Sequence, residues 1–386
     1  MTHTDARVTQ TPQATPAGRR VPLLDVLRGV AILGTLMTNV WIFTGPGAEW
    51  GALESGMATG PVESTFGVLA NGKFLSLLTI LFGVGLAIQY DSAKRRGQPW
   101  PGRYRWRALF LFAEGTVHFV LVFAWDVLMG YAVIALLVAW LLTRSERAQR
   151  RVMWWAAGIH LAAMGLLTAA LAATGDGTDD GIPEDVVDLY AHGSYPAQIA
   201  FRLENALALR MEPVLTFFLL LFLFLLGVRL FRAGAFGADE TGRRLRSRLL
   251  AWGIGLGLPL NAAAALAGSD LFLLARYGTA PLLALGYIGL VGAVVDRVRR
   301  PGPLMTGLTS VGRTALSGYV LQNALCVLIS YGIGLGLAER LDSTGPWWVV
   351  ALWATVCAVL MAGSTLWLRR FSTGPLESVQ KWALRR

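Results

Sequence analysis

Charged residues are scarce in this chain. Asp, Glu, Lys and Arg together make up 15% of its 386 residues, whereas 54% are hydrophobic and 14 are tryptophan. A chain with so little charge and so much apolar surface cannot be a water-soluble globule. The composition therefore indicates a polytopic, all-α membrane protein, which we expect in the plasma membrane.

Cysteine is also nearly absent. The two cysteines, Cys326 and Cys357, both lie inside apolar segments, so no disulfide framework can be read from the sequence. Neither has a basic or metal-ligand pattern beside it, and we expect both to be packing residues. No nucleotide-binding glycine fingerprint is present. We accordingly expect no resident metal and no bound cofactor.

Long apolar runs are abundant. A bilayer core of about 30 Å needs roughly 20 apolar residues in a helix. The sequence predicts about ten such segments, at approximately 22–43, 73–90, 107–124, 127–143, 152–173, 213–231, 249–268, 271–294, 314–335 and 346–368. Residues 1–20 are polar and predicted to be disordered. They do not resemble a cleaved signal, because the next segment begins with Asp25 and Arg28 and lacks a small-residue cleavage site.

The basic residues predict an orientation. Of the 34 Lys and Arg, 27 fall in alternate loops, while the intervening loops are acidic. By the positive-inside rule both termini are predicted to be cytoplasmic, and this distribution explains the net charge of +10 without a nucleic-acid partner. The predicted organisation is a transmembrane domain at 21–370, with an extracytoplasmic loop at 175–211 and a cytoplasmic tail at 371–386. The loop contains an amphipathic pattern at 195–210, typical of either a lid or an interfacial segment; a solvated connector is equally compatible.

Three ionisable residues mark the segment at 113–131. Glu114 and His118 are four residues apart, so a helix places them on one face, and Asp126 follows at the predicted extracytoplasmic turn. Ionisable groups inside a membrane are costly and indicate a functional site. A carboxylate beside His118 suits a general base, with Glu114 as the nearer candidate partner. The alternatives are a buried histidine bonded to a backbone carbonyl, and an Asp126 that only caps the next helix.

Other polar residues fall in or beside apolar segments. Asp25 and Arg28 are three apart and are predicted to pair, and Asn39 needs a hydrogen-bond partner at depth. Lys73 begins its predicted helix on the acidic-loop side, where snorkelling to the headgroups is expected. Arg276 is expected to face the bundle interior or a polar cavity.

Taken in order, several short motifs resemble the DUF418 family, the YeiB-like membrane proteins. The resemblance covers nearly the whole chain after residue 20. It rests on Leu24-Asp25-x-Leu27-Arg28-Gly29 with Asn39, Lys73-Phe74-x-Ser76-Leu77 with Gly83-x-Gly85, Gly115-x-x-His118 with Trp125-Asp126, Gly312-Arg313-x-Ala315-Leu316 with Tyr319 and Gln322, and Gly374-Pro375-Leu376-Glu377.

This resemblance implies a place among the broader transmembrane acyltransferases, which include the acyltransferase-3 proteins and the lysosomal heparan glucosaminide acetyltransferase. It implies a bundle of ten to eleven helices that transfers an acyl group from cytoplasmic acyl-CoA to a hydroxyl or amine acceptor such as a sugar. Acyltransferase-3 proteins carry a catalytic histidine at the end of the first-helix motif, where this chain has Asn39. Their catalytic assignment therefore does not transfer to this chain.

If acyl transfer is the activity, His118 is the expected general base, oriented by Glu114 or Asp126. Asn39 or Arg276 is expected to polarise the thioester carbonyl.

Asp25, Arg28 and the basic loop are expected to line the CoA entrance. Lys73, Arg313 and Gln322 are further candidates for substrate binding. The competing hypotheses are a proton-coupled transporter or flippase, in which buried Glu, His and Arg form a proton relay, and a scaffold whose polar groups are structural.

Overall fold

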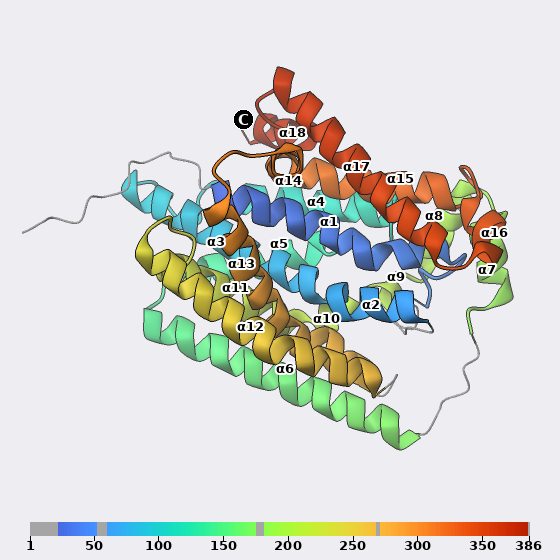
Figure 1. The fold of residues 1–386 in the computed structure, drawn as a ribbon, viewed down its shortest axis with the longest axis horizontal. Helices are drawn as coiled ribbons and strands as arrows, with labels where there is room; N and C mark the ends of the chain where they lie inside the picture. The colour runs from blue at the N-terminus through green and yellow to red at the C-terminus, as the bar shows by residue number, and fades with distance from the viewer. Residues whose placement is uncertain (1–21, 52–59, 175–180, 268–270, 385–386) are drawn as a thin grey trace, which may run out of the picture.

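The protein folds into a helical bundle. Its structure is a computed structural model that describes residues 22–51, 60–174, 181–267 and 271–384. Helix accounts for 81% of the structure, and the described ranges contain no strand, so the all-helical prediction is confirmed. The helices pack side by side (Figure 1). The predicted disorder of residues 1–20 lies outside the described residues.

The elements follow one another with short connections. In chain order they are α1 (Pro22–Thr44), α2 (Pro61–Ala70), α3 (Lys73–Arg95), α4 (Tyr104–Leu121), α5 (Leu128–Leu141), α6 (Glu146–Thr174), α7 (Glu184–Ala191), α8 (Tyr195–Glu204), α9 (Ala206–Leu209), α10 (Met211–Leu215), α11 (Phe217–Arg232), α12 (Glu240–Leu266), the π-helix η2 (Leu274–Thr279), α13 (Ala280–Arg297), α14 (Pro303–Arg313), α15 (Ala315–Ser330), α16 (Leu337–Leu341), the 3₁₀-helix η3 (Asp342–Thr344), α17 (Trp347–Arg370) and α18 (Pro375–Ala383).

Within the described ranges, six helical segments are long and apolar enough to cross a membrane: Pro22–Thr44, Pro61–Arg95, Glu146–Ala173, Glu240–Leu266, Leu274–Arg297 and Trp347–Arg370. The basic connections α3–α4, α5–α6 and α11–α12 lie together at one end of the bundle, at the left of Figure 1. We call this the basic end. Helices α7, α8 and α16 lie at the opposite end.

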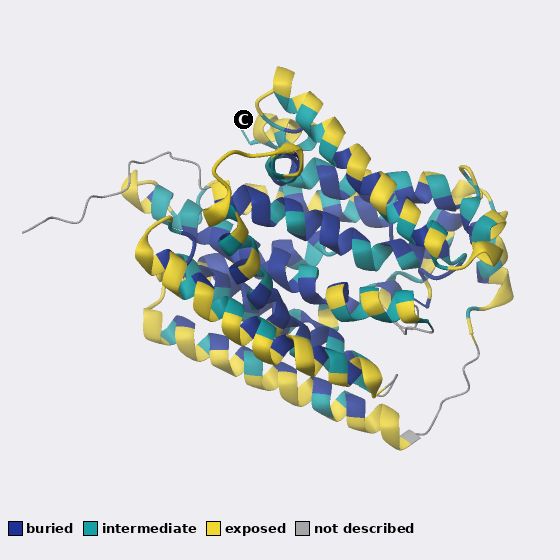
Figure 2. Cartoon of the chain, viewed as in Figure 1, coloured by how far each residue is buried: buried dark blue, intermediate teal, exposed yellow. Residues whose placement is uncertain are grey.

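Burial separates central from peripheral helices. About two thirds of the apolar window of α1 is buried (67%), against 22% in α6 and in α12. Figure 2 shows the same contrast, with α1 largely buried and α6 and α12 exposing one face. The exposed apolar faces of α6 and α12 are suited to contact with lipid rather than with water.

Glycines bring central helices into backbone contact. A Cβ on Gly312 of α14 would lie 1.7 Å from the carbonyl oxygen of Asp25, and a Cβ on Gly29 of α1 would lie 2.0 Å from the carbonyl oxygen of Leu308. Only glycine permits this approach of α1 and α14. The start of α1, with Asp25 and Arg28, is thereby fixed against the end of α14.

Helix interruptions meet near mid-depth of the bundle. Helices α2 and α3 form one span that breaks at Asn71 and Gly72, where Gly72 adopts a positive φ of 78°. The carbonyl oxygen of Arg276, in the π-helix η2, occupies the position a Cβ on Gly72 would need. The ring of Phe74, just beyond the break, packs on Gly34 near the middle of α1. Irregular backbone at this depth is expected only where it is buried in protein or lines a cavity.

A buried ion pair fastens the end opposite the basic end. The Glu49 carboxylate accepts hydrogen bonds from the Arg202 guanidinium of α8, at 3.0 and 3.1 Å, and both side chains are fully buried. Tyr331 and Tyr190 also donate their hydroxyls to Glu49, at 2.7 and 3.3 Å. The amphipathic pattern predicted at 195–210 forms α8 and α9. Glu49 thus ties the 184–211 segment, which we call the cap, to the bundle.

A surface contact adds to this attachment. His192, at the end of α7, contacts Asp188 at 2.9 Å and Glu339 of α16 at 3.2 Å. The hydrogen bond to Asp188, followed by the charge of Glu339, raises the pKa of His192. The contact therefore favours the folded state at pH below the ordinary histidine value and loses that effect as pH rises through the raised pKa.

Candidate functional site

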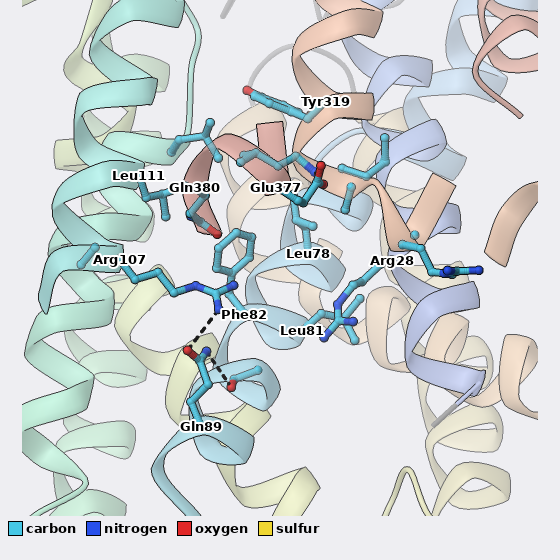
Figure 3. A pocket seen from close by; sticks show the side chains of 18 of the residues that line it. Arg28, Leu78, Leu81, Phe82, Gln89, Arg107, Leu111, Tyr319, Glu377 and Gln380 are labelled. Atoms are coloured by element: carbon cyan, nitrogen blue, oxygen red, sulfur yellow. Dashed lines mark hydrogen bonds between the residues drawn. The ribbon is translucent and has the colours of Figure 1, made fainter. Parts of the chain in front are cut away.

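A cavity of about 270 Å³ opens at the basic end of the bundle. It lies between α1, α3, α4, α14, α15 and α18, and Figure 3 shows the side chains that line it. Its lining residues are Arg28, Ile32, Leu78, Leu81, Phe82, Gly85, Gln89, Tyr104, Arg107, Ala108, Leu111, Leu128, Gly312, Arg313, Ala315, Leu316, Tyr319, Glu377 and Gln380.

Three arginines line the outer part of the cavity. Arg107 of α4 donates to Gln89 of α3 at 3.1 Å, and Arg28 of α1 pairs with Asp25 at 3.2 Å, as the sequence predicted. Figure 3 shows Arg107 and Arg28 reaching in from opposite sides. The third, Arg313, donates to the carbonyl oxygen of Ser372 at 3.4 Å. Guanidinium groups collected at one mouth favour a ligand with phosphate or carboxylate oxygens.

The C-terminal helix closes one side of the cavity. Glu377 of α18 accepts hydrogen bonds from the Leu316 amide at 2.9 Å and from the Ser317 hydroxyl at 2.5 Å. Its carboxylate therefore satisfies backbone donors at the N-terminus of α15. This contact explains how the Gly374-Pro375-Leu376-Glu377 motif, distant in sequence, becomes part of the cavity wall.

The inner part of the cavity is apolar and ends at Tyr319. Side chains from α1, α3, α4 and α5 form its walls, among them Ile32, Leu78, Leu111 and Leu128. The cavity therefore combines a basic mouth with an apolar interior, a combination suited to a ligand with a charged head and an apolar arm.

Directly behind Tyr319 lie His118 and Asp126. His118 Nδ1 is 3.4 Å from Asp126 Oδ1, and both side chains are essentially fully buried. The Tyr319 hydroxyl donates to the same carboxylate oxygen at 3.4 Å, and its ring lies 5.3 Å from the imidazole. On the other side of the imidazole, Asn323 Nδ2 is 3.2 Å from His118 Nε2. A polar group from α4, the α4–α5 turn and α15 is thus assembled within the bundle.

Asp126 reaches His118 because the chain turns back into the bundle. Helix α4 ends at Leu121, and the following residues return so that Asp126 lies against Gly115. A Cβ on Gly115 would lie 2.6 Å from Asp126 Oδ2, so the hairpin needs glycine there. The prediction that Asp126 lies at an extracytoplasmic rim was therefore wrong. Its predicted capping role is confirmed, since Oδ2 accepts from the Leu128 amide of α5 at 3.0 Å.

The expected pairing of Glu114 with His118 does not occur. Both Glu114 carboxylate oxygens are buried and accept no hydrogen bond from the described residues, whereas Asp126 contacts the imidazole. Sharing a helix face brings Glu114 only to the neighbouring turn of α4. The turn after α4 instead places the Asp126 carboxylate beside the His118 imidazole.

The cap supplies a cation to this group. Arg210 donates to the Asp126 carbonyl oxygen at 2.9 Å, and its guanidinium lies 3.9 Å from the Asp126 carboxylate. It also lies over the Phe119 ring, 4.2 Å from the centroid. Arg210 thus partly balances the buried charge of Asp126.

Arg276 and Lys73 belong to a second polar cluster rather than to the cavity. Arg276 donates to Glu212 at 2.8 Å and to Asn71, and the Tyr277 hydroxyl donates to Glu212 at 2.6 Å. The prediction that Arg276 faces the interior is confirmed. Lys73 does not snorkel as predicted: it is 2% exposed and donates to the Gly67 carbonyl oxygen at 3.0 Å. The reason is that α2 precedes Lys73 in the same span. The C-terminal carbonyl groups of α2 therefore lie beside the Lys73 ammonium and bind it.

Of the remaining predicted residues, some lie near His118 and others lie away from the cavity. Gln322 is fully buried beside the His118 group and donates to Thr35 of α1 at 3.5 Å. Asn39, one turn further along α1, is half-buried and is not among the residues lining the cavity. The cysteines Cys326 and Cys357 are buried and unbridged, as predicted.

Comparison with known proteins finds a family model and two relatives that resemble the chain. Residues 230–386 match the family model described as "Protein of unknown function (DUF418)". The chain is 27% identical over 391 residues to the uncharacterized protein YxaH of Bacillus subtilis (strain 168), covering 95% of this chain and 94% of that protein. It is 28% identical over 380 residues to the uncharacterized protein YeiB of Escherichia coli (strain K12), covering 92% and 93%. The resemblance seen in the sequence motifs is thereby supported: the chain is similar to the DUF418 family over residues 230–386 and to these two proteins over nearly its whole length.

Proposed function

We propose that this protein is a membrane-bound acyltransferase that takes an acyl group from acyl-CoA and transfers it to a hydroxyl or amine acceptor such as a sugar. We further propose that it crosses the plasma membrane about ten times, with the basic end and both termini in the cytoplasm, and that it is related to the broader transmembrane acyltransferases. In this orientation the cavity opens toward the compartment that contains acyl-CoA.

One observation supports this proposal above the others: the arginine-lined cavity ends beside the buried His118–Asp126 pair. Arg28, Arg107 and Arg313 suit the phosphates of CoA, and the apolar interior suits the uncharged arm that carries the thioester. From Arg107 to Gly115, at the level of Asp126, α4 rises about 12 Å. An extended arm entering at Arg107 can therefore bring a thioester to the inner end.

The cavity volume restricts the donor. At about 270 Å³ the cavity is slightly smaller than typical ligand pockets, which enclose about 300–1,000 Å³. It has room for the thioester arm with a short acyl group, while the nucleotide part of CoA stays at the mouth. We therefore propose short-chain acyl-CoA as the donor.

In the proposed reaction the carboxylate of the buried His118–Asp126 pair is the final acceptor of the proton. The acceptor loses its proton toward this pair, its oxygen or nitrogen bonds to the thioester carbon, and the carbon–sulfur bond breaks. The proton returns to the departing thiolate, which leaves as CoA. A proton acceptor positioned in this way contributes about 10²–10⁴-fold to a rate.

Equilibrium binding of acetyl-CoA to the protein in nanodiscs tests the proposed donor site. We expect saturable binding, weakened tenfold or more by Arg107→Gln, because a hydrogen bond to a charged group contributes about 1.5–3 kcal/mol. Arg150→Gln is the matched control, since Arg150 is exposed on α6 outside the cavity. Equal binding by the two variants, or no saturable binding by the unmodified protein, contradicts the donor site.

A second candidate function, a proton-coupled transporter or flippase, is favoured by the helix interruptions. The α2–α3 break and the π-helix η2 meet at Asn71, Gly72 and Arg276, with Glu212 beside them. Interrupted helices with charged groups near mid-depth are typical of transporter sites. Proton uptake coupled to solute flux in proteoliposomes that lack CoA would support this function over acyl transfer.

A further inference from the structure

Tyr319 separates the cavity from the His118–Asp126 pair. It lines the inner end of the cavity, where Figure 3 shows its ring, and it is 3% exposed. His118 and Asp126 are each 2% exposed and are not among the residues lining the cavity. A substrate in the cavity therefore meets Tyr319 before it can meet either of them.

Both nitrogens of His118 face protein groups. The Asn323 amide nitrogen can only donate, so at 3.2 Å it assigns His118 Nε2 the acceptor role. The ring proton then lies on Nδ1, the atom 3.4 Å from Asp126 Oδ1. In this arrangement His118 Nδ1 faces the Asp126 carboxylate in a 3.4 Å contact that is not a hydrogen bond, and neither nitrogen is directed at the cavity. The imidazole therefore acts on a substrate through another group.

The group that connects the two is the Tyr319 hydroxyl. It reaches the same Asp126 oxygen, Oδ1, at 3.4 Å, while the other carboxylate oxygen caps α5. A separation of 3.4 Å is long for a hydrogen bond between oxygens, but contacts used in catalysis often shorten only when substrate is bound. Tyr319 is therefore the one member of the His118 group placed to touch both a bound substrate and the buried carboxylate.

We propose, building on the acyltransferase function above, that Tyr319 is the catalytic residue that takes the proton of a hydroxyl acceptor. As the acceptor oxygen attacks the thioester carbon, its proton passes to the Tyr319 oxygen and the Tyr319 proton passes to Asp126 Oδ1. When the carbon–sulfur bond breaks, Tyr319 gives a proton to the departing thiolate, which leaves as CoA thiol, and Asp126 returns its proton to the Tyr319 oxygen. His118, Asn323 and Arg210 are positioning residues that hold Asp126.

Tyr319→Phe is the test, because it removes one oxygen and keeps the ring that packs on His118. With acetyl-CoA as donor and octyl glucoside as acceptor, release of free CoA thiol is measured on the protein in nanodiscs. We expect kcat to fall about 10²-fold or more, with KM for acetyl-CoA within about twofold of the unmodified value. A loss confined to kcat points to a step after donor binding, whereas a structural defect lowers the amount of folded protein or raises KM.

Tyr131→Phe is the matched control. Tyr131 is fully buried, and its hydroxyl bonds to Thr79 at 2.7 Å outside the cavity lining. Removing that stronger hydrogen bond should lower stability without lowering kcat. Equal kcat values for the two variants would overturn the role of Tyr319 while leaving the acyltransferase proposal intact. Failure of the unmodified protein to release CoA above the protein-free rate, to octyl glucoside or to water, would overturn both.

Discussion

His118→Ala is expected to lower kcat for acyl transfer by about 10²–10⁴-fold while leaving acetyl-CoA affinity unchanged. The rate falls because Asp126 loses the group that holds its carboxylate toward Tyr319. Affinity is retained because His118 does not line the cavity. Single-turnover transfer and equilibrium binding of acetyl-CoA, measured on the same nanodisc sample, separate the two effects.

Two further variants show whether this loss is specific. His118→Gln keeps a side chain that can donate to Asp126, so we expect it to recover part of the rate. His160→Ala removes an equally buried histidine, which bonds to the Tyr277 carbonyl oxygen at 3.1 Å and lies outside the cavity lining. If His118→Ala and His160→Ala have the same effect on transfer, the loss reflects destabilisation and His118 has no part in the reaction.

Glu49→Ala is expected to cause the largest loss of stability, about 3–5 kcal/mol in the free energy of unfolding. The substitution leaves the fully buried Arg202 guanidinium without its carboxylate and removes the acceptor of Tyr331 and Tyr190. Unfolding in detergent micelles, followed by tryptophan fluorescence against denaturant, measures the change.

Glu146→Ala is the corresponding control at the protein surface. Glu146 lies 3.8 Å from Arg232 with 85% of its side chain exposed, so the pair is screened by solvent and contributes at most about 1 kcal/mol. In Glu49→Ala/Arg202→Met the buried charge is removed together with its partner, and we expect part of the stability to return. Equal losses for Glu49→Ala and Glu146→Ala are incompatible with a cap fastened by Glu49.

The helices could be predicted from the sequence because a membrane imposes one simple requirement. Apolar segments of membrane-spanning length must be helical, and their hydropathy is visible residue by residue. Hydropathy does not show where a helix is interrupted inside the membrane, so the α2–α3 break was missed. Asn71 and Gly72 resemble the end of a loop, so the predicted helix began at Lys73 although the span continues from Pro61. Lys73 was consequently placed at a membrane surface.

The site could be predicted only in part. Charge in an apolar run stands out in a sequence, so it drew attention to His118 and Asp126, which the structure brings together, and also to Glu114, which it leaves apart. Of their partners, Tyr319 was visible only as part of the family motif and Asn323 not at all, because both are uncharged, lie about 200 residues away, and meet the His118–Asp126 pair only once the chain has folded. The depth of Asp126 also could not be read, since the apolar turn at 122–127 carries no signal that the chain folds back.

The positions of the Lys and Arg residues indicate buried polar contacts that hydropathy alone does not reveal. Seven Lys and Arg lie outside the basic loops: Arg28, Lys73, Arg202, Arg210, Arg276, Arg313 and Arg340. Two line the cavity, Arg210 contacts Asp126, Arg202 pairs with Glu49, and Lys73 and Arg276 lie at the helix interruptions. Lys and Arg residues outside the basic loops, which the positive-inside rule does not explain, were therefore a better guide to buried polar groups than hydropathy.

Covalent labelling tests most directly whether the cavity is the donor site. A cysteine is placed at Leu111, on the inner cavity wall, and in a second variant at Ser145, exposed at the basic end; the native Cys326 and Cys357 are buried. Each variant is treated with bromoacetyl-CoA, whose carbon bonds to the thiol sulfur as bromide leaves, and the adduct is measured by intact mass. We expect labelling at position 111 to be blocked by excess acetyl-CoA, and labelling at position 145 to be unaffected. Labelling at 111 that acetyl-CoA does not block, or that never occurs while 145 is labelled, would contradict the donor site.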